Sequence, residues 1–155
     1  MHHKIVVGTR ETLEDYINGT IVGNPVPSIE LPVGGKTLIF TTPAVTVTFS
    51  GALGSQLTLA TVISEINTAL GATVASPRAN DYGPVTTNRD GDTKVVPRQR
   101  IVLQRDAGLV LNGAGTAVAL LGLSAFTSAG IIPIAKISGM TAGPSIGQLV
   151  LIVSP

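Results

Sequence analysis

One segment of this sequence has a strong helical period, and the segments around it do not. Leu59–Leu70 carries its large apolar side chains three, four, seven and eleven positions apart, which places them on one face of a helix. Thr58 precedes the segment at the N-cap position, and Gly71 follows where a C-cap residue belongs. The other apolar segments are short and bounded by Gly, Pro or Asn, as strands are. We therefore predict an α+β fold that is mainly β: a small sheet or sandwich packed by one amphipathic helix, with extended N- and C-terminal arms.

Strict alternation of apolar and polar residues identifies the clearest strand. Val45, Val47 and Phe49 point to one face, and polar residues point to the other, which is typical of a half-buried strand. Gly34-Gly35 predicts a hairpin turn between the strands on either side of it. The complete set of expected strands is Lys4–Val7, Ser28–Val33, Lys36–Thr42, Val45–Ser50, Ala72–Ser76, Arg100–Arg105, Leu109–Asn112 and Leu149–Val153.

Two shorter segments carry weaker helical signals. Thr9 is placed to cap a short helix over Arg10–Ile17, which Asn18-Gly19 would end. Thr116–Leu121 fits a short helical turn closed by Gly122. The apolar faces of the expected helix and strands together define a predicted core. Its members are Phe49, Leu59, Val62, Ile63, Ile66, Leu70, Val102, Leu103, Val110, Leu121 and Leu123.

Proline, glycine and polar residues divide the chain into three parts. We predict an N-terminal arm over residues 1–27, a core domain over 28–123 and an extended C-terminal arm or strand over 124–155. Within the core, residues 77–98 are polar and contain an Asp90-Gly91 turn signal, which predicts a projecting hairpin. The last part has two interpretations. It lies over a neighbouring molecule or adds a strand to its sheet, or it supplies an ordinary final strand to the core sheet.

The composition favours burial of this chain's surface by other subunits. Charged residues make up 12% of the sequence, about half the usual share of a soluble domain, and mean hydropathy is +0.44. No apolar run reaches the roughly 18 residues of a membrane span, and no signal peptide is visible. A net charge of +1 provides no strong field for nucleic acid or a membrane surface. We expect apolar surface that is covered by neighbouring copies or partner proteins.

The sequence offers no evident set of catalytic residues. It contains no cysteine, which excludes thiolate nucleophiles and zinc–thiolate sites. Its two histidines, His2 and His3, are adjacent, so a Ser–His–Asp arrangement has no histidine from the body of the chain. The carboxylates are scattered without a distinctive pair. Aromatic residues, which usually line ligand pockets, are scarce at 3%. We predict that the protein is not an enzyme and uses no cofactor and no metal.

Two short motifs resemble ligand-binding loops, but their context favours simple turns. Gly35-Lys36-Thr37 ends like a phosphate-binding loop, yet Glu30 stands where the first glycine belongs, and a strand-like segment follows. Asn88–Asp92 has oxygen-bearing side chains at alternate positions, as calcium loops do. Its glycine falls between Asp90 and Asp92, which is not the spacing of an EF-hand. A weak cation site near these two acids stays an open alternative to a turn.

The order of signals becomes more specific in the middle of the chain. The alternating strand is followed by the capped helix, which ends in Ile66-Asn67, and then by Gly71 and further strands. Leu121-Gly122-Leu123 closes the segment. This order, from Val45 to Leu123, resembles the IN motif of flagellar hook-associated proteins, which is also seen in tailed-bacteriophage virion proteins such as contractile tail sheath subunits. The resemblance implies a small module that builds or coats a polymer.

The resemblance implies a bacteriophage virion structural protein, assembled in the cytoplasm of the host bacterium. It would stabilise a capsid, neck or tail through contacts with copies of itself and with other virion proteins, with no membrane involved. The alternative is a receptor- or carbohydrate-binding module, for which Tyr82 is the aromatic candidate. Basic and acidic residues are mixed around the polar excursion, which favours salt bridges over nucleic-acid binding. The residues predicted to make inter-subunit contacts are Arg78, Tyr82, Arg89, Lys94, Arg98, Ile131, Ile132, Leu149 and Leu151.

Overall fold

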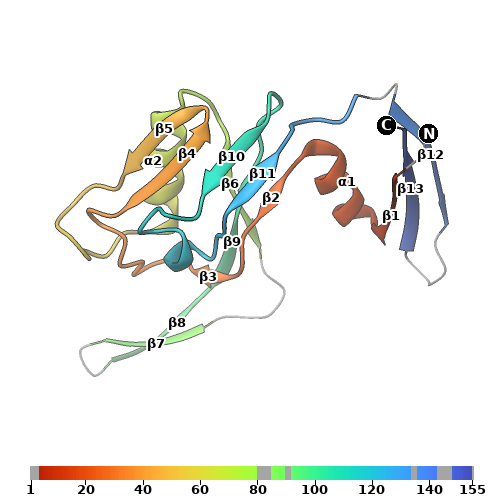
Figure 1. The fold of residues 1–155 in the computed structure, drawn as a ribbon. Helices are drawn as coiled ribbons and strands as arrows, with labels where there is room; N and C mark the ends of the chain where they lie inside the picture. Colours follow the sequence, from red (N-terminus) through yellow and green to blue (C-terminus); the bar gives the residue numbers. More distant parts are fainter. Residues whose placement is uncertain (1–3, 80–84, 90–91, 134–135, 143–147, 155) are drawn as a thin grey trace.

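The computed structural model describes residues 4–79, 85–89, 92–133, 136–142 and 148–154. Within them the chain forms small antiparallel sheets with two α-helices and one short 3-10 helix (Figure 1). The predicted fold class, α+β and mainly β, is confirmed. Two clusters of buried apolar side chains divide the structure into a larger main body and a smaller terminal unit.

The main body is built on two four-stranded sheets. In the first, the strand order is β11-β10-β4-β5, which correspond to Phe126–Ser128, Leu109–Asn112, Thr37–Thr42 and Ala44–Thr48. The second sheet is centred on β9 (Arg98–Leu103). Here β6 (Ala75–Ala79) pairs with one edge of β9, and the short strands β2 (Ile21–Val22) and β3 (Val26–Pro27) pair with the other.

The predicted amphipathic helix forms over its whole length as α2 (Leu59–Leu70). The Thr58 side chain accepts a hydrogen bond from the backbone N–H of Thr61, and Gly71 ends the helix with a φ of 66°. The apolar face of α2 is buried in the main-body core, as its period predicts. The turn near residue 120 is likewise present, as a 3-10 helix over Ala119–Leu121 that ends at Gly122.

Most of the predicted core residues lie in the main cluster, with one correction. Val110 is half-buried, because Leu109 and Leu111 on either side of it point into the core, and a strand alternates its faces. Val102 is buried, but it lies outside the main cluster, which its neighbours Ile101 and Leu103 join. Ile63 and Leu70 are partly buried against the cluster.

The predicted hairpin across Gly34-Gly35 is wrong. Residues 28–33 form no strand beyond a single bridge between Leu31 and Leu57, whose backbone groups exchange two hydrogen bonds of 2.9 Å. Glu30 has a φ of 61°, which interrupts an extended backbone. Strand β4 instead pairs with β5 and β10. Gly34 and Gly35 follow residues 28–33 as predicted, but the hairpin partner of β4 is β5, which comes after β4 in the sequence.

Strands β7 (Val85–Arg89) and β8 (Asp92–Val96) form a two-stranded antiparallel sheet of their own. This pairing lies within the range where a projecting hairpin was predicted, and Figure 1 shows it extending away from the main body. Asp90-Gly91, the predicted turn, lies outside the described residues. The open question of a cation site there therefore stays a prediction.

The terminal unit joins segments from distant parts of the sequence. It consists of β1 (Lys4–Thr9), α1 (Arg10–Asn18), β12 (Ile137–Ala142) and β13 (Gln148–Val153). The three strands form one antiparallel sheet of order β1-β13-β12, here called the terminal sheet. Strand β13 thus pairs within this sheet and not with the sheets of the main body, where the second interpretation of the C-terminal segment placed it. In Figure 1, α1 lies between the terminal sheet and the main body.

Candidate functional site

Helix α1 covers one face of the terminal sheet. The Thr9 side chain caps the helix by accepting from the backbone N–H of Thr12, and Gly19 ends it with a φ of 62°. Leu13 of α1 is fully buried against Leu151 and Val153 of β13, and partly buried apolar side chains surround these three. This inner face gives the terminal unit a small hydrophobic core of its own.

The opposite face of the terminal sheet exposes apolar side chains of β1 and β13, and Thr141 of β12, which lies opposite Val150, adds an exposed polar residue. Ile5 is 65% exposed and Val7 is 49% exposed. In the strand register, Ile5 lies opposite Ile152 and Val7 lies opposite Val150, so these four side chains share one face. Val150 and Ile152 are half-buried. We call this four-residue surface the outer face. Because α1 lies on the side of the main body, the outer face points away from the rest of the described chain (Figure 1).

The sequence of β13 is that of a strand covered on both sides. Leu149 through Val153 are all aliphatic, with no polar residue at alternate positions. A strand with one face in solvent normally alternates, whereas consecutive apolar residues are typical of strands with both faces buried. In the terminal sheet, α1 covers the inner face, and the described residues leave the outer face open. The composition of β13 therefore indicates that a further layer of protein covers the outer face.

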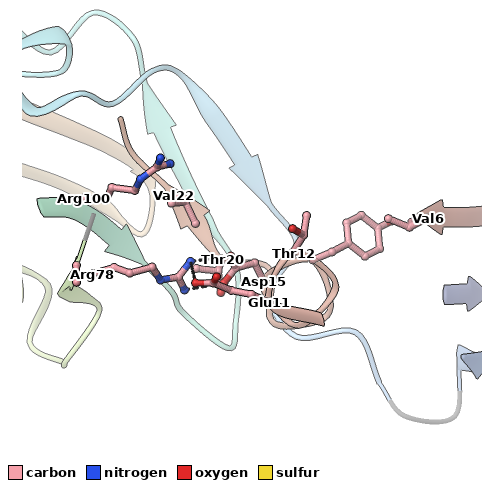
Figure 2. A pocket seen from close by; sticks show the side chains of 10 residues that line it. Val6, Glu11, Thr12, Asp15, Thr20, Val22, Arg78 and Arg100 are labelled. Atoms are coloured by element: carbon pink, nitrogen blue, oxygen red, sulfur yellow. Dashed lines mark hydrogen bonds and ion pairs between the residues drawn. The ribbon is translucent and has the colours of Figure 1, made fainter. Parts of the chain in front are cut away.

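A cleft of about 730 Å³ separates α1 from the second sheet of the main body, and an ion pair spans it (Figure 2). Both terminal nitrogens of Arg78 donate to the carboxylate of Asp15, each at 2.8 Å, and Glu11 lies 3.3 Å from the same guanidinium. Hydrogen bonding to Asp15 raises the pKa of Arg78 above its usual value.

A second link holds the end of α1 to the main body. The Ser128 hydroxyl, which is buried, donates to the carbonyl of Gly19 at 2.6 Å and accepts from the backbone N–H of Gly130 at 3.1 Å. The backbone N–H of Ile132 also donates to the carbonyl of Ile17 at 2.7 Å. The two chain segments that leave the main body are thus tied to each other near Gly19.

The cleft brings together charged groups that already serve to join the two parts. Arg78 binds the acids of α1, and the wall also contains a second guanidinium, that of Arg100, and the ring of Tyr16. Short polar and aliphatic side chains, among them Thr12 and Val22, complete it. Across the described ranges, no three His, Asp or Glu side chains are grouped so that they could hold a metal ion. The ion pairs across the cleft make it a joint between α1 and the second sheet of the main body.

The ion pair across the cleft gives a testable coupling. In a double-mutant cycle of Arg78→Ala and Asp15→Ala, we expect a coupling of about 1 kcal/mol in the free energy of unfolding, because the pair is bidentate and partly shielded from solvent. The pair Arg10–Glu14 on the exposed side of the same helix is the matched control, and its coupling should be smaller. Urea denaturation of the four variants measures each coupling. If the Arg78–Asp15 and Arg10–Glu14 couplings are equal, the ion pair across the cleft stabilises the protein no more than an exposed pair on one helix does.

The predicted contact residues lie in different environments. Arg78 is engaged within the chain, and Leu151 is fully buried under α1, so it serves the core of the terminal unit and not an exposed contact. Leu149 and Ile132 pack partly against the same cluster, whereas Ile131 is exposed. Of the remaining four, Arg98 is half-buried on β9. Arg89 lies in β7 and Lys94 in β8, and their side chains are not described. Tyr82 lies outside the described residues.

The structure places the two predicted contact residues of β13 on its inner face. Within the predicted strand Leu149–Val153, the contact residues were assigned to Leu149 and Leu151, which point to α1. Val150 and Ile152 point outward, together with Ile5 and Val7. The missed signal is the run of apolar residues at consecutive positions in both β1 and β13.

Comparison with known proteins gives no relative from which a function follows. Protein-family models, curated proteins and solved structures were compared, and none of them matches this chain. In the part of the chain that the structure describes, no helix is both long enough and apolar enough to cross a membrane.

Proposed function

We propose that this protein is a non-catalytic structural subunit that works by packing against copies of itself and against partner proteins. The observation that carries the proposal is the outer face: four aliphatic side chains on one side of a sheet, with Ile5 and Val7 open to solvent. Exposed apolar patches of this kind are typical of interaction sites. The low share of charged residues, 12%, agrees with a chain whose surface is shared with neighbours.

We propose further that the assembly is a bacteriophage virion, in which the subunit stabilises a capsid, neck or tail. The support is the resemblance of Val45–Leu123 to the IN motif, together with the structural work done by its two central residues. Ile66 is fully buried in the core. Asn67 uses its side chain to tie the end of α2 to Val74 and Ala75 at the start of β6. A helix–turn–strand module fixed in this way provides a rigid body from which the terminal unit extends.

Electron microscopy of the concentrated protein tests the proposal. We expect regular assemblies with a constant subunit spacing, such as rings, sheets or filaments, because identical contacts repeat symmetrically. Single particles of monomer size at every concentration would contradict it. Binding to a glycan array that is lost in Tyr82→Ala would favour the receptor- or carbohydrate-binding alternative instead.

A further inference from the structure

We infer that the terminal unit is hinged to the main body at residues 19–21 and 130–132, and that the ion pairs of Arg78 with Asp15 and Glu11, here called the latch, hold it in place. When the latch opens, the terminal unit swings away from the second sheet of the main body. The two hydrophobic clusters share no member, so this motion disrupts neither core. The inference concerns motion within one chain and does not depend on the proposed function.

The first connection between the two parts changes its hydrogen-bond partner within two residues. The backbone N–H of Thr20 donates to the carbonyl of Asp15 in α1 at 2.8 Å. The next residue, Ile21, pairs instead with Leu103 of β9 in the main body. Gly19 precedes this point with a φ of 62°, and glycine changes its backbone torsions at little steric cost. The chain can therefore bend here while both sets of bonds stay intact.

The second connection shows the same change of partner. The backbone N–H of Ile131 donates to the carbonyl of Asp106 in the main body at 3.2 Å. The N–H of Ile132 donates to the carbonyl of Ile17 in α1 at 2.7 Å. Neighbouring residues thus belong to different parts of the structure, which is the arrangement expected at a hinge.

The two connections lie side by side, so they form a single pivot. The Ser128 hydroxyl joins them through its bonds to the carbonyl of Gly19 and the N–H of Gly130. A Cβ atom on Gly19 would lie 2.5 Å from the carbonyl oxygen of Gly130, which places the two backbones in direct contact. Because both connections cross at this place, rotation of the terminal unit about it stretches neither of them.

Open space beside the pivot leaves room for this rotation. Besides the cleft of about 730 Å³, a second cavity of about 300 Å³ lies between α1 and the segment that follows β11. Asp15, Tyr16 and Thr20 line both of them. Rigid contacts between parts of a protein are closely packed, and parts joined without a large apolar interface are expected to move relative to each other.

The latch spans the cleft between walls of opposite charge. Arg78 and Arg100 lie opposite each other on β6 and β9, so both guanidinium groups belong to the main-body wall. Like charges in such a cross-strand pair repel each other. Glu11 and Asp15 on the α1 wall offset this repulsion when the latch is closed. The latch is partly exposed, so dissolved salt screens it, whereas the backbone bonds at the pivot are far less sensitive to salt.

Distances between two spin labels test the hinge and the latch. The chain has no cysteine, so Ala60→Cys on α2 and Ile5→Cys on β1 place one label at an exposed position of each part. Pulsed electron paramagnetic resonance, with the labelled chain diluted into unlabelled copies, should give one narrow distance distribution at low salt. Salt at about 1 M shortens the screening length to about 3 Å and should add a second, broader distribution. Arg78→Gln should do the same at low salt and raise the open fraction about fivefold.

Two matched variants separate the latch from other effects of charge. Arg10→Gln removes an ion pair that lies within α1 and does not cross the cleft, so it should leave the distances unchanged. The double variant Arg78→Glu with Asp15→Arg should restore the narrow distribution, because opposite charges again face each other across the cleft. Circular dichroism verifies that each variant is folded. A distribution that neither salt nor Arg78→Gln changes would overturn the inference, and so would an equal response to Arg10→Gln.

Discussion

Asn67→Ala should lower the free energy of unfolding of the main body by about 3 kcal/mol. The Asn67 amide nitrogen donates to the carbonyl of Ala75 at 2.9 Å, and its amide oxygen accepts from the backbone N–H groups of Val74 and Ala75 at 2.9 and 2.7 Å. Alanine removes all three bonds and leaves the N–H and the carbonyl of Ala75 without these partners at a buried site, whereas the N–H of Val74 keeps its bond of 3.0 Å to the carbonyl of Ala72. An orphaned buried backbone group costs about as much as the bond it lost, or more.

Urea denaturation and thermal unfolding measure this effect. For a chain of 155 residues, a loss of about 3 kcal/mol lowers the Tm by roughly 6–12 °C. Thr68→Ala is the matched control, because Thr68 is the exposed neighbour on the same turn of α2, and its replacement should change stability by no more than about 0.5 kcal/mol. A loss below about 1 kcal/mol in Asn67→Ala would mean that the turn after α2 is held mainly by other contacts.

Leu13→Ala should open the terminal unit while the main body stays folded. Leu13 is one of three fully or nearly fully buried side chains in the cluster between α1 and the terminal sheet. Removing a buried leucine costs about 3 kcal/mol. A unit this small gains no more than about 3–5 kcal/mol from its core, so one such change removes most of its stability. The main-body cluster is separate and keeps all of its members.

Hydrogen exchange followed by mass spectrometry distinguishes this local opening from general destabilisation. We expect residues 4–18 and 148–153 to lose protection in Leu13→Ala, while α2 keeps its protection. Val7→Ala changes the exposed side of the same sheet and should affect protection far less, because Val7 contributes little to the buried cluster. An equal loss of protection in α2 would show that the two parts unfold together, contrary to the division into two cores.

Local signals in the sequence predicted the elements that depend on neighbouring residues. Helix α2 forms within the predicted bounds because its apolar period, the Thr58 cap and the Gly71 cap all act within a few residues. The same holds for Thr9 and Gly19 at the ends of α1. By contrast, residues 28–33 are apolar enough for a strand, but their backbone bonds to the loop around Leu57, and no local pattern indicates that partner.

The candidate site was harder to predict than the fold because it depends on which strands become neighbours. The sequence indicates that Leu149–Val153 is a strand, but not that it pairs with β1 from the other end of the described chain. That pairing decides that Leu151 faces α1 and that Val150 faces outward. The ion pair of Arg78 with Asp15 joins residues 63 positions apart, and it also follows from tertiary structure alone.

The central claim is that this protein acts by associating with copies of itself. Static light scattering of the unmodified chain over a wide range of concentration tests it most directly. We predict that the average mass rises reversibly with concentration from the 15.8 kDa of the monomer toward that of a dimer and larger assemblies. A mass that stays at the monomer value at every concentration would contradict the account.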